Sequence, residues 1–216
     1  MRVRTEARRR AILEAARSVF QEQGFERASM AEISKRLGGS KATLYGYFKS
    51  KEELFVASVE LDIAGEVETI AEKVRSFPEI YDALIYLGRA FLERVTSDRP
   101  IAISRMIAGL PADTRIGLTF YERGLRQAWM RIAVFFGEQM VAGKLRRANG
   151  WVMAMHFKGL LEGEFVERRM LNALPHELDQ QTIERVANDA VDTFLRAYGP
   201  QSVAYEVEHR PKAVNG

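Results

Sequence analysis

The chain has 216 residues, 47% of them hydrophobic and 28% charged, a balance that excludes an intrinsically disordered protein and allows a sizeable buried core. It has no cysteine, which excludes disulfides, thiolate metal sites and cysteine nucleophiles and fits a reducing cytosol. The net charge of +3 is unevenly spread, because residues 1–51 carry +7 and the remainder carries −4. This asymmetry predicts a polyanion-binding head on a near-neutral body, although a solvated basic helix would give the same pattern.

The N-terminal segment MRVRTEARRR is followed by AILEAARS, in which charged residues interrupt the apolar run. This composition does not fit a signal peptide. No stretch approaches 18 uninterrupted apolar residues, so we expect no membrane span and no membrane partner.

The first half of the chain predicts four helices. Apolar residues recur at helical spacing over residues 4–23, and Gly24 stands where that helix should stop. The capping box 29-SMAE-32 opens a short helix that ends at Gly38-Gly39, and Ser40 can cap a third helix to about residue 48. A second capping box, 50-SKEE-53, starts a long helix that ends near Pro78.

The second half continues with apolar residues at helical spacing and shows no strand-like alternation. We expect an all-α protein, since helices are predicted over residues 79–97, 99–109, 113–142, 150–172 and 179–198. The tail 201–216 is polar, and we expect it to be flexible.

Residues 29–48 read as a short helix, a tight glycine turn and a second short helix, which is the layout of a helix-turn-helix. In that motif the second helix enters the major groove of double-stranded DNA. Leu44 and Phe48, four residues apart, would anchor this helix to the core. The remaining faces would meet DNA, and the predicted contacts are Ser29, Ser40, Lys41, Ala42, Thr43, Tyr45, Gly46, Tyr47, Lys49 and Lys51. Tyr45 and Tyr47 taken singly could equally be core residues.

Residues 8–56 resemble the DNA-binding domain of the tetracycline-repressor (TetR) family of bacterial regulators. The shared pattern includes Ile12-Leu13, Gly24-Phe25, Ser40-Lys41, Thr43-Leu44-Tyr45 and Tyr47-Phe48. One departure is Gly38-Gly39, where the family more often has glycine followed by valine. The loss of that valine removes a packing contact, so we expect a looser turn.

The resemblance implies a cytoplasmic homodimeric repressor whose small-molecule effector binds the C-terminal helices and alters the spacing of two DNA-reading heads. It implies a helix-turn-helix DNA-binding domain over residues 1–50 and a helical ligand-binding and dimerisation domain over residues 51–200. A constitutive repressor that senses no ligand, or a helical enzyme or carrier with a solvated basic face, are the alternatives.

Two apolar segments of the body carry candidate contacts. Gly159 and Gly163 would let a partner helix approach, and with Val191, Phe194 and Leu195 they form the predicted dimer interface, unless both helices only close the monomer core. Methionine and aromatic residues adapt to irregular ligands, and the candidate pocket residues are Met106, Trp129, Phe136, Met153 and Phe157, which could also be plain core.

Enzyme motifs are missing from the sequence. His156, His176 and His209 lack metal-ligand spacing, and neither a nucleophile elbow nor a phosphate-binding glycine loop occurs. We therefore expect a protein that is not an enzyme and that has no metal and no cofactor.

Overall fold

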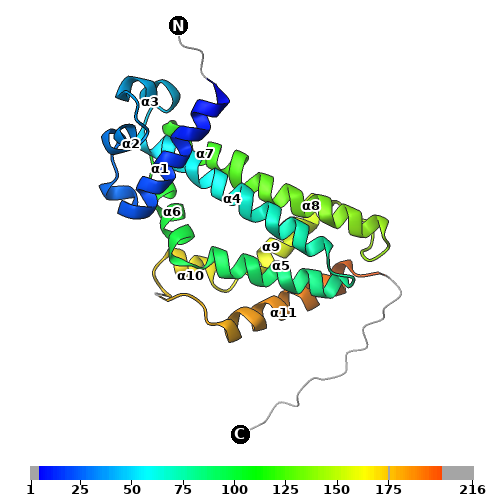
Figure 1. The fold of residues 1–216 in the computed structure, drawn as a ribbon. Helices are drawn as coiled ribbons and strands as arrows, with labels where there is room; N and C mark the ends of the chain where they lie inside the picture. Colours follow the sequence, from blue (N-terminus) through cyan, green and yellow to red (C-terminus); the bar gives the residue numbers. More distant parts are fainter. Residues whose placement is uncertain (1–4, 175, 201–216) are drawn as a thin grey trace. The chain divides into compact units, whose positions relative to one another are not determined.

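The computed structural model describes residues 5–174 and 176–200, and every regular element in these residues is a helix (Figure 1). The predicted all-α fold is therefore confirmed. None of the helices described is long and apolar enough to cross a membrane. The predicted flexible tail, 201–216, lies outside the described residues.

The chain divides into two compact units. Unit 1 contains the described residues up to Thr69 together with Ile103–Ala128, and unit 2 contains the rest. Three helices, α4 (Lys51–Arg75), α6 (Asp98–Ala108) and α8 (Arg126–Val141), contribute residues to both units. The described part of the predicted head, residues 5–50, thus lies in a larger compact unit with part of the predicted body.

Unit 1 is built on α1 (Glu6–Arg27), α2 (Met30–Arg36) and α3 (Lys41–Tyr47), which pack against the first part of α4. Each short helix begins at a serine, as predicted, because the Ser29 and Ser40 hydroxyls accept the backbone N–H of Glu32 and Thr43. The α1 helix changes direction at Gly24, whose φ of 75° is the left-handed conformation that glycine adopts most readily. Unit 1 is completed by most of α6, a 3-10 turn (Ala112–Thr114), α7 (Ile116–Phe120) and a π-helical turn, η2 (Tyr121–Leu125).

Unit 2 packs α11 (Gln180–Tyr198) against α5 (Ile80–Val95) and α9 (Gly150–Glu162) (Figure 1). The rest of α8 and α10 (Val166–Met170) complete it. Aromatic side chains fill its core: Phe136, Phe157 and Phe194 are all fully buried and their rings contact one another. Because these helices carry one continuous apolar stripe each, burial of that stripe explains why they pack.

Two predicted helices are interrupted. The helix predicted over 150–172 ends at Glu162, and Phe165, with φ −121°, separates it from α10. The helix predicted over 113–142 begins only at Ile116, because a 3-10 turn and Arg115, with φ 57°, precede it, and it contains the π-helical turn η2. Apolar spacing marked the correct segments, but it does not register a single break inside them.

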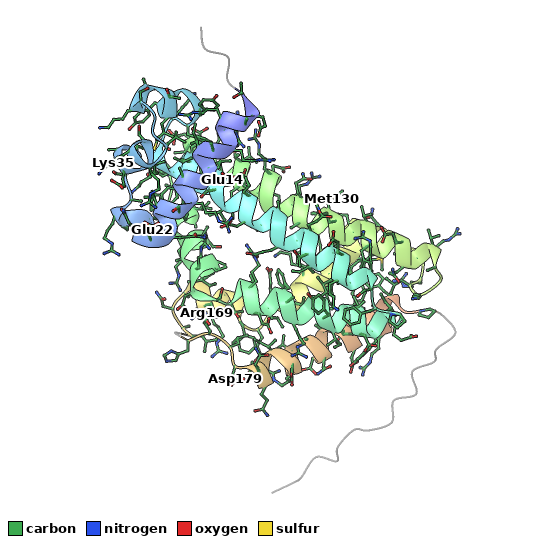
Figure 2. The ribbon with its side chains drawn as sticks, viewed as in Figure 1. Glu14, Glu22, Lys35, Met130, Arg169 and Asp179 are labelled. Atoms are coloured by element: carbon green, nitrogen blue, oxygen red, sulfur yellow. The ribbon has the colours of Figure 1, made fainter. Side chains whose placement is uncertain are left out.

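Buried Arg169 fixes the connection after α10 within unit 2. Its guanidinium donates to the carbonyl oxygens of Thr96 (2.8 Å) and Leu174 (2.9 Å) and to the Asp98 carboxylate (2.5 Å). The side chain is 3% exposed, and Figure 2 shows it on α10. These bonds tie the end of α5 and the start of α6 to the loop that follows α10.

Candidate DNA-binding site

The turn between α2 and α3 is held by hydrogen bonds. Gly38 adopts φ 65°, which favours glycine, and the buried Ser34 hydroxyl donates to the Gly39 carbonyl oxygen at 2.8 Å. The Gly39 N–H donates to the Ser34 carbonyl at 3.2 Å. A Cβ at Gly39 would lie 2.7 Å from a guanidinium nitrogen of Arg8, so glycine admits this neighbour. The turn we expected to be loose is therefore well supported, and Ser34 is a residue that sequence reasoning missed.

The α3 helix is fastened to the core through one face, as predicted. Leu44 is 0% exposed and Phe48 is 2% exposed. The Arg9 guanidinium lies over the Phe48 ring at 5.4 Å, a cation–π contact between α1 and the end of α3. The Ser40 hydroxyl accepts the Thr43 N–H at 3.1 Å and fixes the first turn. A helix held in this way presents its other faces in a defined orientation.

The outward side of α3 carries most of the predicted DNA contacts. Lys41, Ala42 and Lys49 are exposed, Tyr45 is 51% exposed, and Thr43 and Gly46 are partly exposed. A Cβ added at Gly46 would meet nothing within 4 Å, so the space beside its backbone is open. Cations, hydroxyls, a methyl group and accessible backbone are the groups that bind phosphates and base edges in a major groove.

Tyr47 and Lys51, two further predicted DNA contacts, are partly buried and also bind the ends of α1. The Tyr47 hydroxyl accepts the Thr5 N–H at 3.0 Å. The Lys51 ammonium donates to the carbonyl oxygens of Phe25 (2.9 Å) and Glu26 (3.3 Å) and lies 4.2 Å from the Phe25 ring centroid. Tyr47 binds the N-cap residue of α1, and Lys51 binds carbonyl oxygens of its last turn. Both side chains therefore stabilise the ends of α1, where backbone groups lack partners within the helix.

An ion pair joins α1 to α2 beside the turn. Arg36 donates to the Glu22 carboxylate (2.5 Å) and to the Ser18 hydroxyl (2.8 Å). Hydrogen bonds from Arg36 and Ser18 lower the pKa of the Glu22 carboxyl below its ordinary value. The charge of Arg36 is thus partly neutralised by Glu22, whereas Lys41 and Lys49 keep exposed cationic side chains. Ser29, another predicted contact, is exposed and caps α2.

The predicted pocket residues do not all lie together. Trp129, Phe136, Met153 and Phe157 share the core of unit 2, whereas Met106 packs against the core of unit 1. The predicted dimer contacts also divide. Some apolar side chains of unit 2 remain accessible. Met130 on α8, labelled in Figure 2, is 37% exposed.

The predicted dimer residues differ in their exposure. Val191 and Phe194 are 0% exposed and fill the core of unit 2, so their side chains are unavailable to a partner. Leu195 is only partly buried, and both Gly159 on α9 and Gly163, which directly follows α9, are exposed. An apolar stripe on a helix can pack in the core of a subunit or in an interface between subunits. Most of the stripe on α11 packs in the core of unit 2.

Two family models match the chain, and together they span most of the described residues. Residues 12–58 match the model described as bacterial regulatory proteins, tetR family. Residues 82–200, more than half of the chain, match the model described as AefR-like transcriptional repressor, C-terminal domain. The chain belongs to the TetR family of bacterial transcriptional regulators. The TetR family is one of DNA-binding transcriptional regulators rather than of enzymes.

Individual relatives agree with this assignment. The HTH-type transcriptional repressor AcnR of Corynebacterium diphtheriae is 38% identical over 65 residues, which cover 30% of this chain and 34% of AcnR. The chain thus spans about a third of the length of this curated relative. The structure of the flavonoid-responsive regulator FrrA is 30% identical, with a TM-score of 0.62, and the match covers 92% of this chain and 100% of that one.

A TetR-family regulator from Mesorhizobium loti shares the fold. Its TM-score is 0.74 at 24% identity, and the match covers 92% of this chain and 100% of that chain. The likeness therefore extends through both units and is not limited to the helix-turn-helix.

Proposed function

We propose that α3 is the recognition helix and that the protein is a dimeric, ligand-responsive repressor. The observation that carries the proposal is the geometry of α3. Leu44 and Phe48 bury one face, while Lys41, Thr43 and Tyr45 stand on the others. A helix oriented in this way can enter a major groove with its N-terminal residues toward the base edges.

The proposed DNA contacts divide by chemistry. Thr43 and the Ala42 methyl group would meet base edges or a thymine methyl, which gives sequence selectivity. Lys41, Tyr45 and Lys49 would bind phosphates, which fixes the register of the helix on the duplex. Ser29 and Ser40 stand at helix N-termini, where unpaired N–H groups and the helix dipole favour a phosphate. Tyr47 and Lys51 would support this surface from inside.

Dimerisation would use the exposed side of α9. Gly159 lies on it with Leu160, which is 38% exposed, and Val152, which is 42% exposed, and Gly163 directly follows its last residue. A glycine pair four residues apart lets two helices approach closely, and the neighbouring apolar side chains supply buried area. Two heads held at a separation of about 34–36 Å, or a multiple, would read successive half-sites of a palindromic operator.

An effector would bind among the aromatic and methionine side chains of unit 2 and favour a conformation with the wrong head separation. FrrA is described as flavonoid-responsive, which supports a small-molecule effector for this relative. The effect on DNA affinity equals the difference in effector affinity between the two conformations. A constitutive repressor is the second candidate, and the complete burial of Phe136, Met153 and Phe157 in a packed core favours it.

Genomic-fragment selection with the purified protein, followed by release of bound fragments with a panel of small molecules, tests both parts. We expect one palindromic motif to be enriched and at least one compound class to release it. Enrichment without release by any compound would favour the constitutive repressor. Failure to enrich any motif would refute α3 as a recognition helix.

A further inference from the structure

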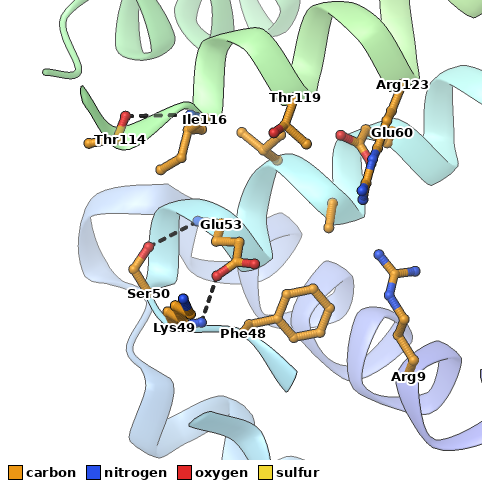
Figure 3. Close-up of a pocket in the computed structure, with 12 residues that line it drawn as sticks. Arg9, Phe48, Lys49, Ser50, Glu53, Glu60, Thr114, Ile116, Thr119 and Arg123 are labelled. Atoms are coloured by element: carbon orange, nitrogen blue, oxygen red, sulfur yellow. Dashed lines mark hydrogen bonds between the residues drawn. The ribbon is translucent and has the colours of Figure 1, made fainter. Parts of the chain in front are cut away.

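A pocket of about 390 Å³ lies within unit 1, separate from the body residues considered above. Its walls come from α1 (Arg9), the end of α3 (Phe48 and Lys49), α4, and the segment from Thr114 to Arg123 (Figure 3). Pockets of this size accommodate small organic molecules. Its lining combines apolar side chains with several charged ones. The hydrogen-bond and ion-pair partners of each charged side chain indicate what the pocket can bind.

One carboxylate in the pocket is unsatisfied. The Oε1 atom of Glu60 is buried and has no hydrogen-bond partner in the described structure. Burial raises the pKa of the Glu60 carboxyl, and the nearby charges of Arg123 and Arg9 oppose this rise. A buried polar atom without a partner is unfavourable, so a ligand that brings a hydrogen-bond donor would be stabilised here.

Two guanidinium groups, those of Arg9 and Arg123, supply positive charge to the pocket. Arg9 and Arg123 point toward Glu60 from different helices (Figure 3). In the described part of the chain, the Arg123 guanidinium forms no hydrogen bond or ion pair, and Arg9 has only a 3.9 Å contact with Glu6 besides its place over Phe48. Guanidinium groups bind carboxylates through paired hydrogen bonds, so this pair suits an anionic group.

The second carboxylate of the pocket, Glu53, is already engaged. It accepts the Lys49 backbone N–H at 2.7 Å, and its own N–H donates to the Ser50 hydroxyl at 3.1 Å. It therefore closes the first turn of α4 as a capping box. The groups left for a ligand include the two guanidiniums and one carboxyl oxygen. The exposed Lys49 and the partly exposed Ile116 and Thr119 also line the pocket.

We propose that this pocket binds a small organic carboxylate that also carries a hydroxyl or amine donor. The carboxylate would be held by Arg9 and Arg123, the donor would bind Glu60, and the carbon skeleton would lie against Ile116. The effector site proposed for unit 2 plays no part in this binding. Because Phe48 anchors α3 and Lys49 follows it, a ligand in the pocket contacts the base of the recognition helix.

The effect on DNA rests on the proposed function, whereas the binding itself does not. A bound ligand would restrict Phe48 and Lys49 and would change DNA affinity by its differential affinity for the DNA-bound and DNA-free forms. Binding and DNA release are therefore measured separately, so that failure of one is distinguishable from failure of the other.

The test uses 4-hydroxybenzoate as a probe on the full chain, followed by amide chemical shifts without DNA. For about ten non-hydrogen atoms we expect a saturable Kd on the order of 1–10 mM, with shifts at residues 48–60 and 114–123. Benzoate lacks the donor and should bind about threefold to tenfold more weakly. Benzylamine carries the opposite charge and should not bind.

Two variants locate the site. Arg123→Gln should weaken 4-hydroxybenzoate binding by about tenfold or more, since a charge-assisted hydrogen bond is lost. Glu60→Leu should bind 4-hydroxybenzoate and benzoate equally. Arg126→Gln is the matched control, because Arg126 pairs with Glu122 at 3.6 Å and does not line the pocket.

Three results would overturn the proposal. They are the absence of saturable shifts in the wild type, tighter binding of benzylamine than of benzoate, and equal affinities in wild type and Arg123→Gln. The first two need no variant, so a variant that fails to fold does not prevent the test. With the selected DNA fragment, saturating probe should change DNA affinity in wild type and leave Arg123→Gln unaffected.

Discussion

Replacing Lys51 by methionine should lower the stability of the protein without changing how its DNA binding depends on salt. The ammonium donates to the Phe25 and Glu26 carbonyl oxygens and lies 4.2 Å from the Phe25 ring centroid. Methionine keeps the apolar stem and removes the charge. The substitution removes one short hydrogen bond from a charged donor, one longer hydrogen bond and a cation–π contact. We therefore expect the free energy of unfolding to fall by about 2 kcal/mol.

Lys49 provides the matched comparison, because it lies two residues away and its side chain is exposed. Lys49→Met should change the unfolding free energy by less than about 0.5 kcal/mol. If its ammonium binds one phosphate in each half-site, the dimer loses two phosphate contacts, and the slope of log affinity against log salt should fall by about two units. Lys51→Met should leave that slope unchanged.

Urea unfolding and fluorescence anisotropy on the selected fragment at several salt concentrations measure both quantities. A Lys51→Met variant that is as stable as the wild type and whose salt slope falls by about two units would refute this assignment of the Lys51 ammonium. That result would place the Lys51 ammonium on a phosphate and not on the end of α1.

Three further substitutions test other parts of the structure. Ser40→Ala removes the acceptor of the Thr43 N–H, so urea unfolding should show a loss of about 1 kcal/mol, with weaker binding to the selected fragment. Arg169→Met leaves two carbonyl oxygens without a donor and should cost about 3 kcal/mol, whereas the exposed Arg168→Met should not. Burial raises the pKa of the Glu60 carboxyl in the folded state. Its contribution to the free energy of unfolding is therefore most favourable at pH values below its unfolded-state pKa, and it is lost as the pH rises through the folded-state pKa. The stability of wild type relative to Glu60→Gln, followed by thermal unfolding from about pH 4 to 7, should therefore fall with rising pH; a difference that is constant or that grows would contradict this sign.

The helices of the head could be predicted from the sequence because their signals are local. The Ser29 and Ser40 caps bind N–H groups three residues away, and Leu44 and Phe48 are four residues apart on one face. Such features are complete within one turn of helix. The exposed positions of Lys41 and Tyr45 then followed from the anchored face.

The roles of Tyr47 and Lys51 could not be predicted, because their partners lie far away along the chain. Tyr47 bonds Thr5, and Lys51 bonds the end of α1 at Phe25. From the sequence alone, a lysine beside a recognition helix is predicted to bind a phosphate, because the backbone carbonyl groups that it contacts in the folded protein are not yet known. The pocket of unit 1 was missed for the same reason, since it joins residues from Arg9 to Arg123.

The body shows a different limit. The apolar stripe of α11 was read as an interface, yet Val191 and Phe194 are fully buried within unit 2. Apolar spacing shows that a face is covered, but it does not identify what covers it. The break after Glu162 was missed although Gly163 stands at it, because a single glycine within an apolar helical pattern does not by itself end a helix.

The most direct test of DNA reading by α3 is the ratio of affinities for the selected fragment and a scrambled fragment, measured by competition anisotropy. The wild type should prefer the selected fragment by about 10³ or more at physiological salt. Thr43→Val should reduce this ratio, since a base contact is lost, and Lys41→Ala should weaken both affinities together, since a phosphate contact is lost. Equal affinities of the wild type for both fragments, or wild-type ratios and affinities in both variants, would contradict the account.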